Sequence, residues 1–154
     1  MRFLPFALAL VLAPLGAQAA DPTYDVAKTD AKGPVGAPLK ASVTVKAKQG
    51  WHLNKDAPFT LKLTPATGVE TPKAKLARAD LAESTDSVAR FEVPFTAAET
   101  GRKTVEAEAG FVLCQDEACR PVREKVSLVV EGAVPTKAEE PKAKGMGKGA
   151  KKKL

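Results

Sequence analysis

The two cysteines of the chain, Cys114 and Cys119, are the residues best suited to chemistry. Only four residues separate them, so a disulfide between them would close a short loop. In an exported protein such a pair is most often structural, although a loop this short contributes only about 2 kcal/mol in the chain-entropy model. A pair on a turn is also within reach of an attacking thiolate, as thiol–disulfide exchange requires. Zinc is disfavoured, because two cysteines and one histidine do not supply four ligands.

Charged neighbours of the pair act on a cysteine pKa in opposite directions. Asp116 and Glu117 lie between the cysteines, and their negative charge raises a thiol pKa. Arg120 follows Cys119 and favours the thiolate. Such a pair suits a disulfide that an activated partner thiolate attacks better than it suits a strong nucleophile.

The only histidine, His52, follows the only tryptophan, Trp51. His52 is interpreted either as a partly buried strand residue or as a group near the thiols that lowers a cysteine pKa or relays a proton. Trp51 is expected to belong to the core rather than to a binding platform. A single histidine, with no Gly-x-Ser-x-Gly motif in the sequence, gives no support to hydrolase chemistry.

Two segments with apolar residues at alternate positions flank the cysteines. One runs from Val105 to Leu113 and the other from Val122 to Val130, where Glu124 is the exception. A period of two predicts half-buried strands. We therefore expect a hairpin whose turn carries both cysteines at an edge that solvent and a partner can reach.

The other alternating segments predict the fold class. They lie at residues 39–47, 59–63 and 89–95, with Tyr24 and Val26 in an edge strand, and Pro and Gly interrupt the chain between them. Residues 70–87 show no such period and are expected to form a long irregular loop rather than a short helical turn through Leu76, Ala79 and Leu81. About six to eight short strands predict an all-β fold, an immunoglobulin-like antiparallel sandwich.

The two ends of the sequence differ from the body in composition. Residues 1–19 combine Arg2, an apolar run and small residues, which predicts a signal peptide cleaved before Ala20 and an exported protein. The body, residues 20–131, has equal numbers of basic and acidic side chains. Residues 132–154 carry seven lysines, and this tail is expected to be disordered. Its charge predicts a solvated tail or attraction to anionic surfaces, without specific nucleic-acid recognition.

Several short motifs occur in the order found in a known family. They are Gly50-Trp51-His52-Leu53-Asn54, Leu61-Lys62-Leu63, Phe91 to Phe95, Leu113-Cys114 through Cys119-Arg120-Pro121, and Val126 to Val130. Over residues 38–131 they resemble the N-terminal periplasmic domain of the DsbD thiol:disulfide interchange protein family. The cysteine segment is the most specific part of this resemblance.

The resemblance implies a redox role for the cysteine pair. In that family an immunoglobulin-like sandwich takes electrons from a membrane-embedded partner and passes them to periplasmic thioredoxin-like proteins, so Cys114 and Cys119 would be the reactive pair. No cofactor or metal ion is expected. Cys119 would be the first target, because the residues that follow it match the family most closely.

The resemblance also implies roles for residues around the pair. His52 and Asn54 match family positions that carry polar or aromatic residues near the cysteines, and Arg120 and Pro121 match the residues after them. The family shields its cysteines with a loop that bears an aromatic residue. Here residues 73–87 offer only Leu76 or Leu81 for that purpose.

Three functions remain open from the sequence. The first is a periplasmic thiol:disulfide exchange domain, such as a protein-disulfide reductase component, that works with separate redox partners. The second is a non-enzymatic exported immunoglobulin-like binding module with a structural disulfide. The third is a small envelope protein that acts through its basic tail.

Overall fold

The computed structural model describes residues 23–116 and 118–135, so the predicted signal peptide and most of the predicted tail lie outside the described residues. Within these ranges the chain is almost entirely strand, and no helix is long and apolar enough to cross a membrane. The strands are β1 (Tyr24–Thr29), β2 (Ala31–Pro34), β3 (Pro38–Ala47), β4 (His52–Leu53), β5 (Thr60–Thr64), β6 (Val69–Glu70), β7 (Lys75–Ala77), β8 (Leu81–Ser84), β9 (Val88–Ala97), β10 (Gly101–Gln115) and β11 (Ala118–Ala133). A 3-10 turn, η1 (Arg78–Asp80), connects β7 to β8.

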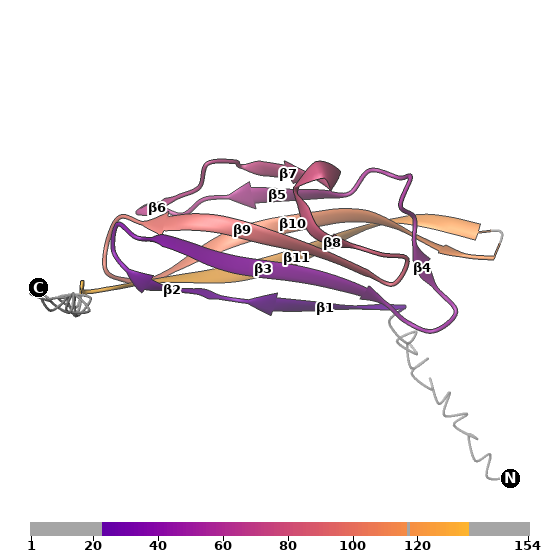
Figure 1. The fold of residues 1–154 in the computed structure, drawn as a ribbon, viewed down its shortest axis with the longest axis horizontal. Helices are drawn as coiled ribbons and strands as arrows, with labels where there is room; N and C mark the ends of the chain where they lie inside the picture. The colour runs from indigo at the N-terminus through magenta and orange to yellow at the C-terminus, as the bar shows by residue number, and fades with distance from the viewer. Residues whose placement is uncertain (1–22, 117, 136–154) are drawn as a thin grey trace, which may run out of the picture.

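The strands form two sheets that pack face to face, as the predicted sandwich requires (Figure 1). Sheet A has the order β1-β3-β9-β6, with β8 also paired to β9. Sheet B has the order β2-β11-β10-β5-β7, with β4 also paired to β10. The pairs are antiparallel except for β2 with β11, which is parallel. The all-β, immunoglobulin-like fold class is therefore confirmed.

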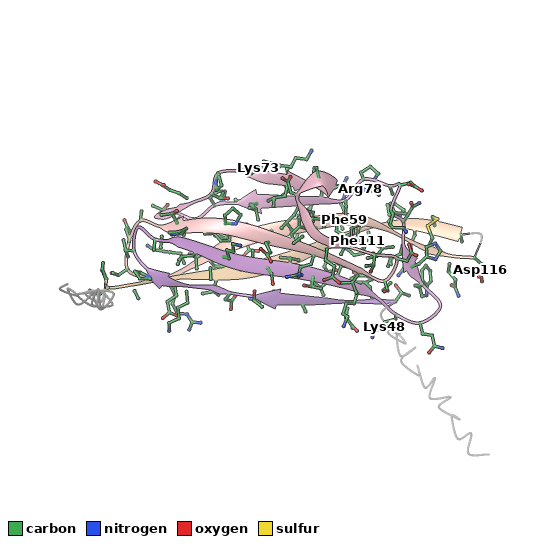
Figure 2. All side chains as sticks on the ribbon, in the orientation of Figure 1. Lys48, Phe59, Lys73, Arg78, Phe111 and Asp116 are labelled. Atoms are coloured by element: carbon green, nitrogen blue, oxygen red, sulfur yellow. A yellow bond between two sulfur atoms is a disulfide. The ribbon has the colours of Figure 1, made fainter. Side chains whose placement is uncertain are left out.

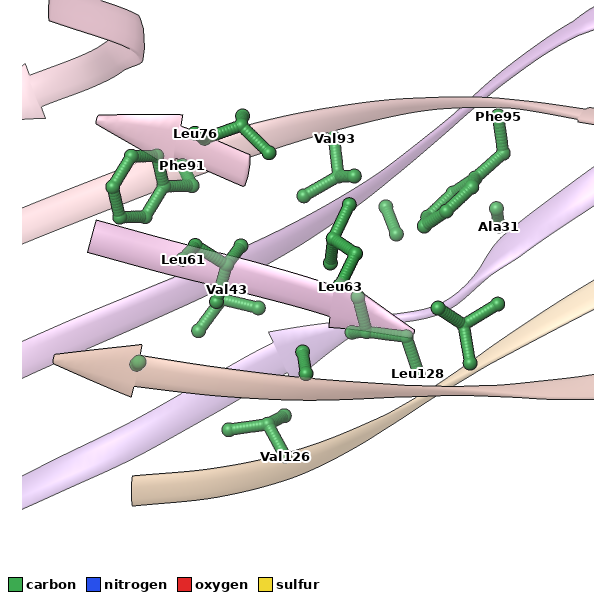
Figure 3. Packing of buried hydrophobic residues seen from close by; sticks show 14 of the residues in the cluster. Ala31, Val43, Leu61, Leu63, Leu76, Phe91, Val93, Phe95, Val126 and Leu128 are labelled. Carbon is green, nitrogen blue, oxygen red and sulfur yellow. The ribbon is translucent and has the colours of Figure 1, made fainter. Parts of the chain in front are cut away.

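Alternate side chains of the long strands fill the space between the sheets (Figure 3). The predicted alternation holds, since each long strand turns one row inward and the other toward solvent. Phe59 links the sheets at the centre, because its ring contacts Phe91 of β9 and stacks on Phe111 of β10, with centroids 5.7 and 5.5 Å away. The side chains with the least exposure are Leu61, Val93, Val105, Ala109, Leu113, Leu128 and Val130.

The chain changes sheets at Asp30, between β1 and β2. A carboxylate oxygen of Asp30 accepts a hydrogen bond of 2.9 Å from the backbone N–H of Val129 in β11. The same oxygen lies 3.2 Å from the Lys28 ammonium. The hydrogen bond from Val129, followed by Lys28, lowers the pKa of Asp30. Asp30 thus ties the N-terminal edge of sheet A to the hairpin strand of sheet B.

Two predictions about regular structure were wrong. The described residues form eleven strands instead of six to eight, and residues 70–87 are mostly short strands and the η1 turn rather than an irregular loop. The missed strands β4, β6, β7 and β8 are two to four residues long. Segments this short cannot display a period of two, so only their long partners reveal them.

Candidate functional site

The cysteines lie at the tip of the β10–β11 hairpin, as predicted, and are joined by a disulfide. Cys114 is the register partner of Cys119, with Cα atoms 4.0 Å apart. Figure 2 shows the sulfur atoms near Asp116, at one end of the long axis of the molecule. Asp116 adopts a positive φ of 42°, which Asp tolerates better than most residues and which a tight hairpin turn requires. The turn chemistry of the sequence therefore brings the two cysteines into register.

The two cysteines differ in exposure. Leu113 points into the core, so the next side chain, Cys114, points to the outer face of sheet B. There Cys114 lies between His52 on β4 and Cys119 on β11, its two register partners. These neighbours leave Cys114 only 3% exposed, whereas Cys119 is exposed. The bonded pair therefore has one buried and one accessible member.

The short strand β4 covers one side of Cys114. Its backbone is fixed by three hydrogen bonds, from Trp51 N–H to Lys48 O, Leu53 N–H to Asp86 O and Asn54 N–H to Val112 O, with lengths of 2.9, 2.6 and 3.0 Å. Gly50 precedes β4 with a φ of 84°, a conformation that glycine adopts without strain. His52 is the register partner of Cys114 in the β4–β10 pair, so it lies near the cysteines as predicted.

Asn54 acts on the backbone rather than on the sulfur atoms. Its side-chain oxygen accepts hydrogen bonds from the N–H groups of Asp56 and Ala57, at 2.9 and 3.2 Å, which closes a turn between β4 and β5. An ion pair of 2.9 Å between Lys55 and Asp86 holds this turn to the loop before β9. The hydrogen bond from Lys55 lowers the pKa of Asp86. Asn54 therefore positions β4, and β4 positions His52.

Arg120 lies on the opposite face of the hairpin from the disulfide. It is the register partner of Leu113, whose side chain points inward. Its guanidinium lies 4.8 Å from the centroid of the Trp51 ring and donates a hydrogen bond to the Thr23 hydroxyl. The cation–π contact joins β11 to the segment before β4. The charge of Arg120 is thus directed away from Cys119, the residue beside it. Pro121 is exposed and pairs with Val112.

A second cluster near the tip was not predicted. The Tyr24 hydroxyl donates a hydrogen bond of 2.6 Å to Glu124, and the Tyr24 ring packs edge-on against Phe111 at 5.2 Å. Burial, followed by the hydrogen bond to Glu124, raises the pKa of Tyr24 to about 12. Glu124 interrupts the apolar alternation of its strand, and this interruption was the signal in the sequence. A strand position on the inner face that carries a carboxylate needs a donor, which Tyr24 supplies.

The expected cover from residues 73–87 is wrong for the two leucines considered. Leu76 pairs with Leu61 and, through it, aligns with Ala109, five residues before Cys114 on β10. Leu81 pairs with Phe91 in sheet A. Both side chains lie against the core instead of the disulfide. The segment that flanks Cys114 is β4.

No group of three or more His, Cys, Asp or Glu side chains in the described part of the chain is arranged to hold a metal ion. The site consists of the disulfide, its neighbour His52 and the Trp51–Arg120 pair behind it. Chemically, a disulfide of this kind can accept two electrons from thiols or can serve as a fixed link between strands.

Comparisons with known proteins do not identify the chain. No protein-family model matches it, and no curated protein matches it. Among solved structures it is similar to AggA, the major subunit of aggregative adherence fimbriae type I from Escherichia coli. The TM-score is 0.40 and the identity is 11%, over 71% of this chain and 94% of that chain. A likeness this weak carries no argument about function, and the resemblance to the DsbD family stays a prediction from the sequence.

Proposed function

We propose that this protein is an exported thiol:disulfide exchange module that accepts electrons through the Cys114–Cys119 pair. The observation that carries the proposal is the unequal exposure of the two cysteines, 3% for Cys114 against an exposed Cys119. Exchange needs one sulfur that a partner can reach and a second that leaves. A disulfide at a hairpin tip meets both needs without opening the core.

The reaction takes two steps. A thiolate of an electron-donating partner with two thiols attacks the sulfur of Cys119, forming an intermolecular disulfide and breaking the Cys114–Cys119 bond. Cys114 leaves as a thiolate and takes up a proton. The second thiol of the partner then attacks the partner's own sulfur in the mixed disulfide. Cys119 is released as a thiolate and is protonated, so two electrons have passed to the pair and the partner is oxidised.

The surroundings of the pair favour the order in which the sulfurs react. Cys114 is held between two strands and is poorly accessible to a partner, so it suits the role of leaving group. His52 is its neighbour on β4 and is suited to supply the proton that the departing thiolate needs. We propose this proton transfer as the function of His52.

A second candidate is a non-enzymatic exported binding module with a structural disulfide. The bonded pair in a complete β-sandwich supports this candidate more directly than it supports exchange, because a structural link requires no partner. The burial of Cys114 also fits a permanent bond. The two candidates differ in one measurable property, the ease with which the bond is reduced.

The deciding experiment is the reduction potential of the pair, measured against glutathione or thioredoxin buffers. Structural disulfides of secreted proteins typically lie below about −300 mV, whereas an exchange couple lies closer to the poise of its partners. A value above that limit is expected here. A more negative value would leave the structural module as the function.

Trapping tests the roles of the two sulfurs. Cys114→Ala is expected to form a stable mixed disulfide through Cys119 with a thioredoxin-like protein that lacks its resolving cysteine and whose remaining sulfur carries a 2-nitro-5-thiobenzoate group, which leaves as the thiolate. Cys119→Ala, in which the remaining sulfur is buried, should form it far more slowly. Equal trapping by both variants would contradict the proposed order of attack, and trapping by neither would contradict exchange.

A further inference from the structure

The outer face of sheet B carries a cluster of cations, which we call the cationic face: Lys75 of β7, Lys62 of β5, and Arg123 and Lys125 of β11. All four side chains are exposed. The strand pairing aligns Lys75, Lys62, Glu108 and Lys125 in one row, and Thr60, Gly110 and Arg123 in the next. The cluster therefore spans four neighbouring strands.

These cations differ from most others on the body. Ion pairs engage the lysines and arginines at positions 28, 32, 40, 48, 55, 73, 90, 102 and 103. Within residues 23–116 and 118–135, none of the four cations of the cationic face forms an ion pair. Glu108 is the acidic side chain in these rows, and Glu106 lies in the next row, where it accepts hydrogen bonds from Ser127. The face keeps an excess of positive charge on a body that is neutral overall.

The surface between the cations is hollowed. Thr60, Lys62, Lys75, Glu108, Gly110 and Arg123 line a hollow of about 210 Å³. A second hollow, of about 330 Å³, adjoins it along Lys62, Glu106, Glu108 and Lys125. Gly110 keeps the first one open, because a Cβ there would lie 2.9 Å from the Thr60 hydroxyl oxygen. Atoms of a partner can therefore approach the strand backbone between the charged side chains.

We propose that the cationic face is a docking surface for an acidic polypeptide segment of a partner protein. The cations lie in two columns, on β5–β7 and on β11, with the glutamates of β10 between them. Strands two apart are separated by roughly 10 Å, so carboxylates of the partner at about that spacing would meet both columns. A continuous phosphate backbone fits less well, because its closely spaced charges would also lie over Glu106 and Glu108.

The position of the face suits an exchange partner but does not depend on exchange. Gly110, Val112 and Cys114 alternate along β10, so their outward positions share one face. The disulfide lies about 13 Å from Gly110 along that strand. A partner docked on the cations would have its adjoining surface over Cys119. The lysine-rich tail of this chain is excluded as the occupant by its own positive charge.

The test compares two charge-matched variants of the full chain, each carrying the tail. Lys62→Gln/Lys125→Gln removes one cation from each column, and Lys32→Gln/Lys40→Gln removes two exposed lysines elsewhere. The probe is fluorescently labelled octaglutamate at low salt. The first variant is expected to bind it roughly 2- to 30-fold more weakly than the second, the range for loss of two exposed charge contacts. Equal weakening in both would overturn the proposal.

Coupling with a carbodiimide locates the probe, because this reagent joins carboxylates to lysines in direct contact. Adducts are expected on Lys62, Lys75 or Lys125, and adducts confined to the tail would overturn the proposal.

Sedimentation of the chain alone tests for a second copy as the occupant. If the chain self-associates and Lys62→Gln/Lys125→Gln abolishes this, the face binds a second copy and the proposal of an acidic polypeptide is overturned. The proposal is also overturned, in favour of nucleic acid, if an oligothymidylate binds the same lysines more tightly than octaglutamate does.

Both variants retain the cysteines, so docking and exchange give separate outcomes. If the reduction potential fits exchange but octaglutamate does not bind the cationic face, only the docking surface is refuted. If octaglutamate binds the face but the potential is that of a structural disulfide, only exchange is refuted. Circular dichroism of each variant checks that these exposed substitutions leave the fold intact.

Discussion

The two halves of β11 lie in different surroundings. From Val126 to Val130 alternate side chains are buried between the sheets, and Leu128 and Val130 are fully enclosed. From Ala118 to Pro121 every residue is exposed, and the strand is held by β10, the disulfide and the contact of Arg120 with Trp51. The base of the hairpin is thus stabilised by burial and its tip by a covalent bond and a few side-chain pairs. Chemistry at the tip can therefore proceed while the base stays folded.

Truncation at the base should have the largest effect on stability. Leu128→Ala is expected to lower the free energy of unfolding by about 2–5 kcal/mol, since it removes a fully buried side chain and leaves a cavity. Urea unfolding measures this loss. Val129→Ala, on the outer face of the same strand, is the control and should cost much less. Similar losses for both would mean that burial does not distinguish the two faces.

Loss of the disulfide should cost less and should act locally. The variant with both Cys114→Ala and Cys119→Ala is expected to lose about 2 kcal/mol, the value for a short loop in the chain-entropy model. Amide hydrogen exchange should accelerate at residues 111–122 and remain slow at residues 126–130. Uniform acceleration along β11 would show that tip and base unfold as one unit.

Removal of the Asp30 carboxylate, which binds the base of the β10–β11 hairpin, should lower the free energy of unfolding by a smaller amount. Asp30→Ala is expected to cost about 1 kcal/mol near neutral pH, because the N–H of Val129 loses its acceptor. The pKa of Asp30 is lowered in the folded protein, so its contribution is present above the ordinary value of 3.8 and is lost as the pH falls below it. The stability gap between wild type and variant, from urea unfolding, should therefore shrink in acid. A gap that grows in acid would contradict this assignment.

The smallest effect is expected at Tyr24, beside the tip. Tyr24→Phe should cost less than about 1 kcal/mol, since it removes one partly exposed hydrogen bond and keeps the ring against Phe111. The raised pKa means that the contribution is complete below pH 10 and is lost as the pH rises through about 12. Unfolding at several alkaline pH values should show wild type approaching the variant. A constant difference over that range would refute the hydrogen bond to Glu124.

Long elements could be predicted from the sequence, and short ones could not. The strands β3, β9, β10 and β11 each repeat the alternation several times, which fixed their existence and inward faces. β4 has only two residues, so its place beside Cys114 follows from hydrogen bonds to distant segments. No local pattern encodes such contacts.

The candidate site was predictable in its position but not in its orientation. The cysteine hairpin and the neighbourhood of His52 follow from the motifs, whereas the direction of Arg120 depends on strand parity at the tip and on the location of Trp51. The sequence placed Arg120 beside Cys119 along the chain. In the fold, adjacent strand residues point to opposite faces, which separates the guanidinium from the sulfur.

The chain enters the sandwich at one end and leaves it at the other. Thr23 contacts Arg120 beside the hairpin tip, whereas Ala133 accepts a hydrogen bond from Val35 at the far end (Figure 1). The choice of attachment point therefore sets the orientation of the body. Immobilised at Thr23, the body would turn its sulfur atoms toward the support, and immobilised at Ala133 it would present them to the medium.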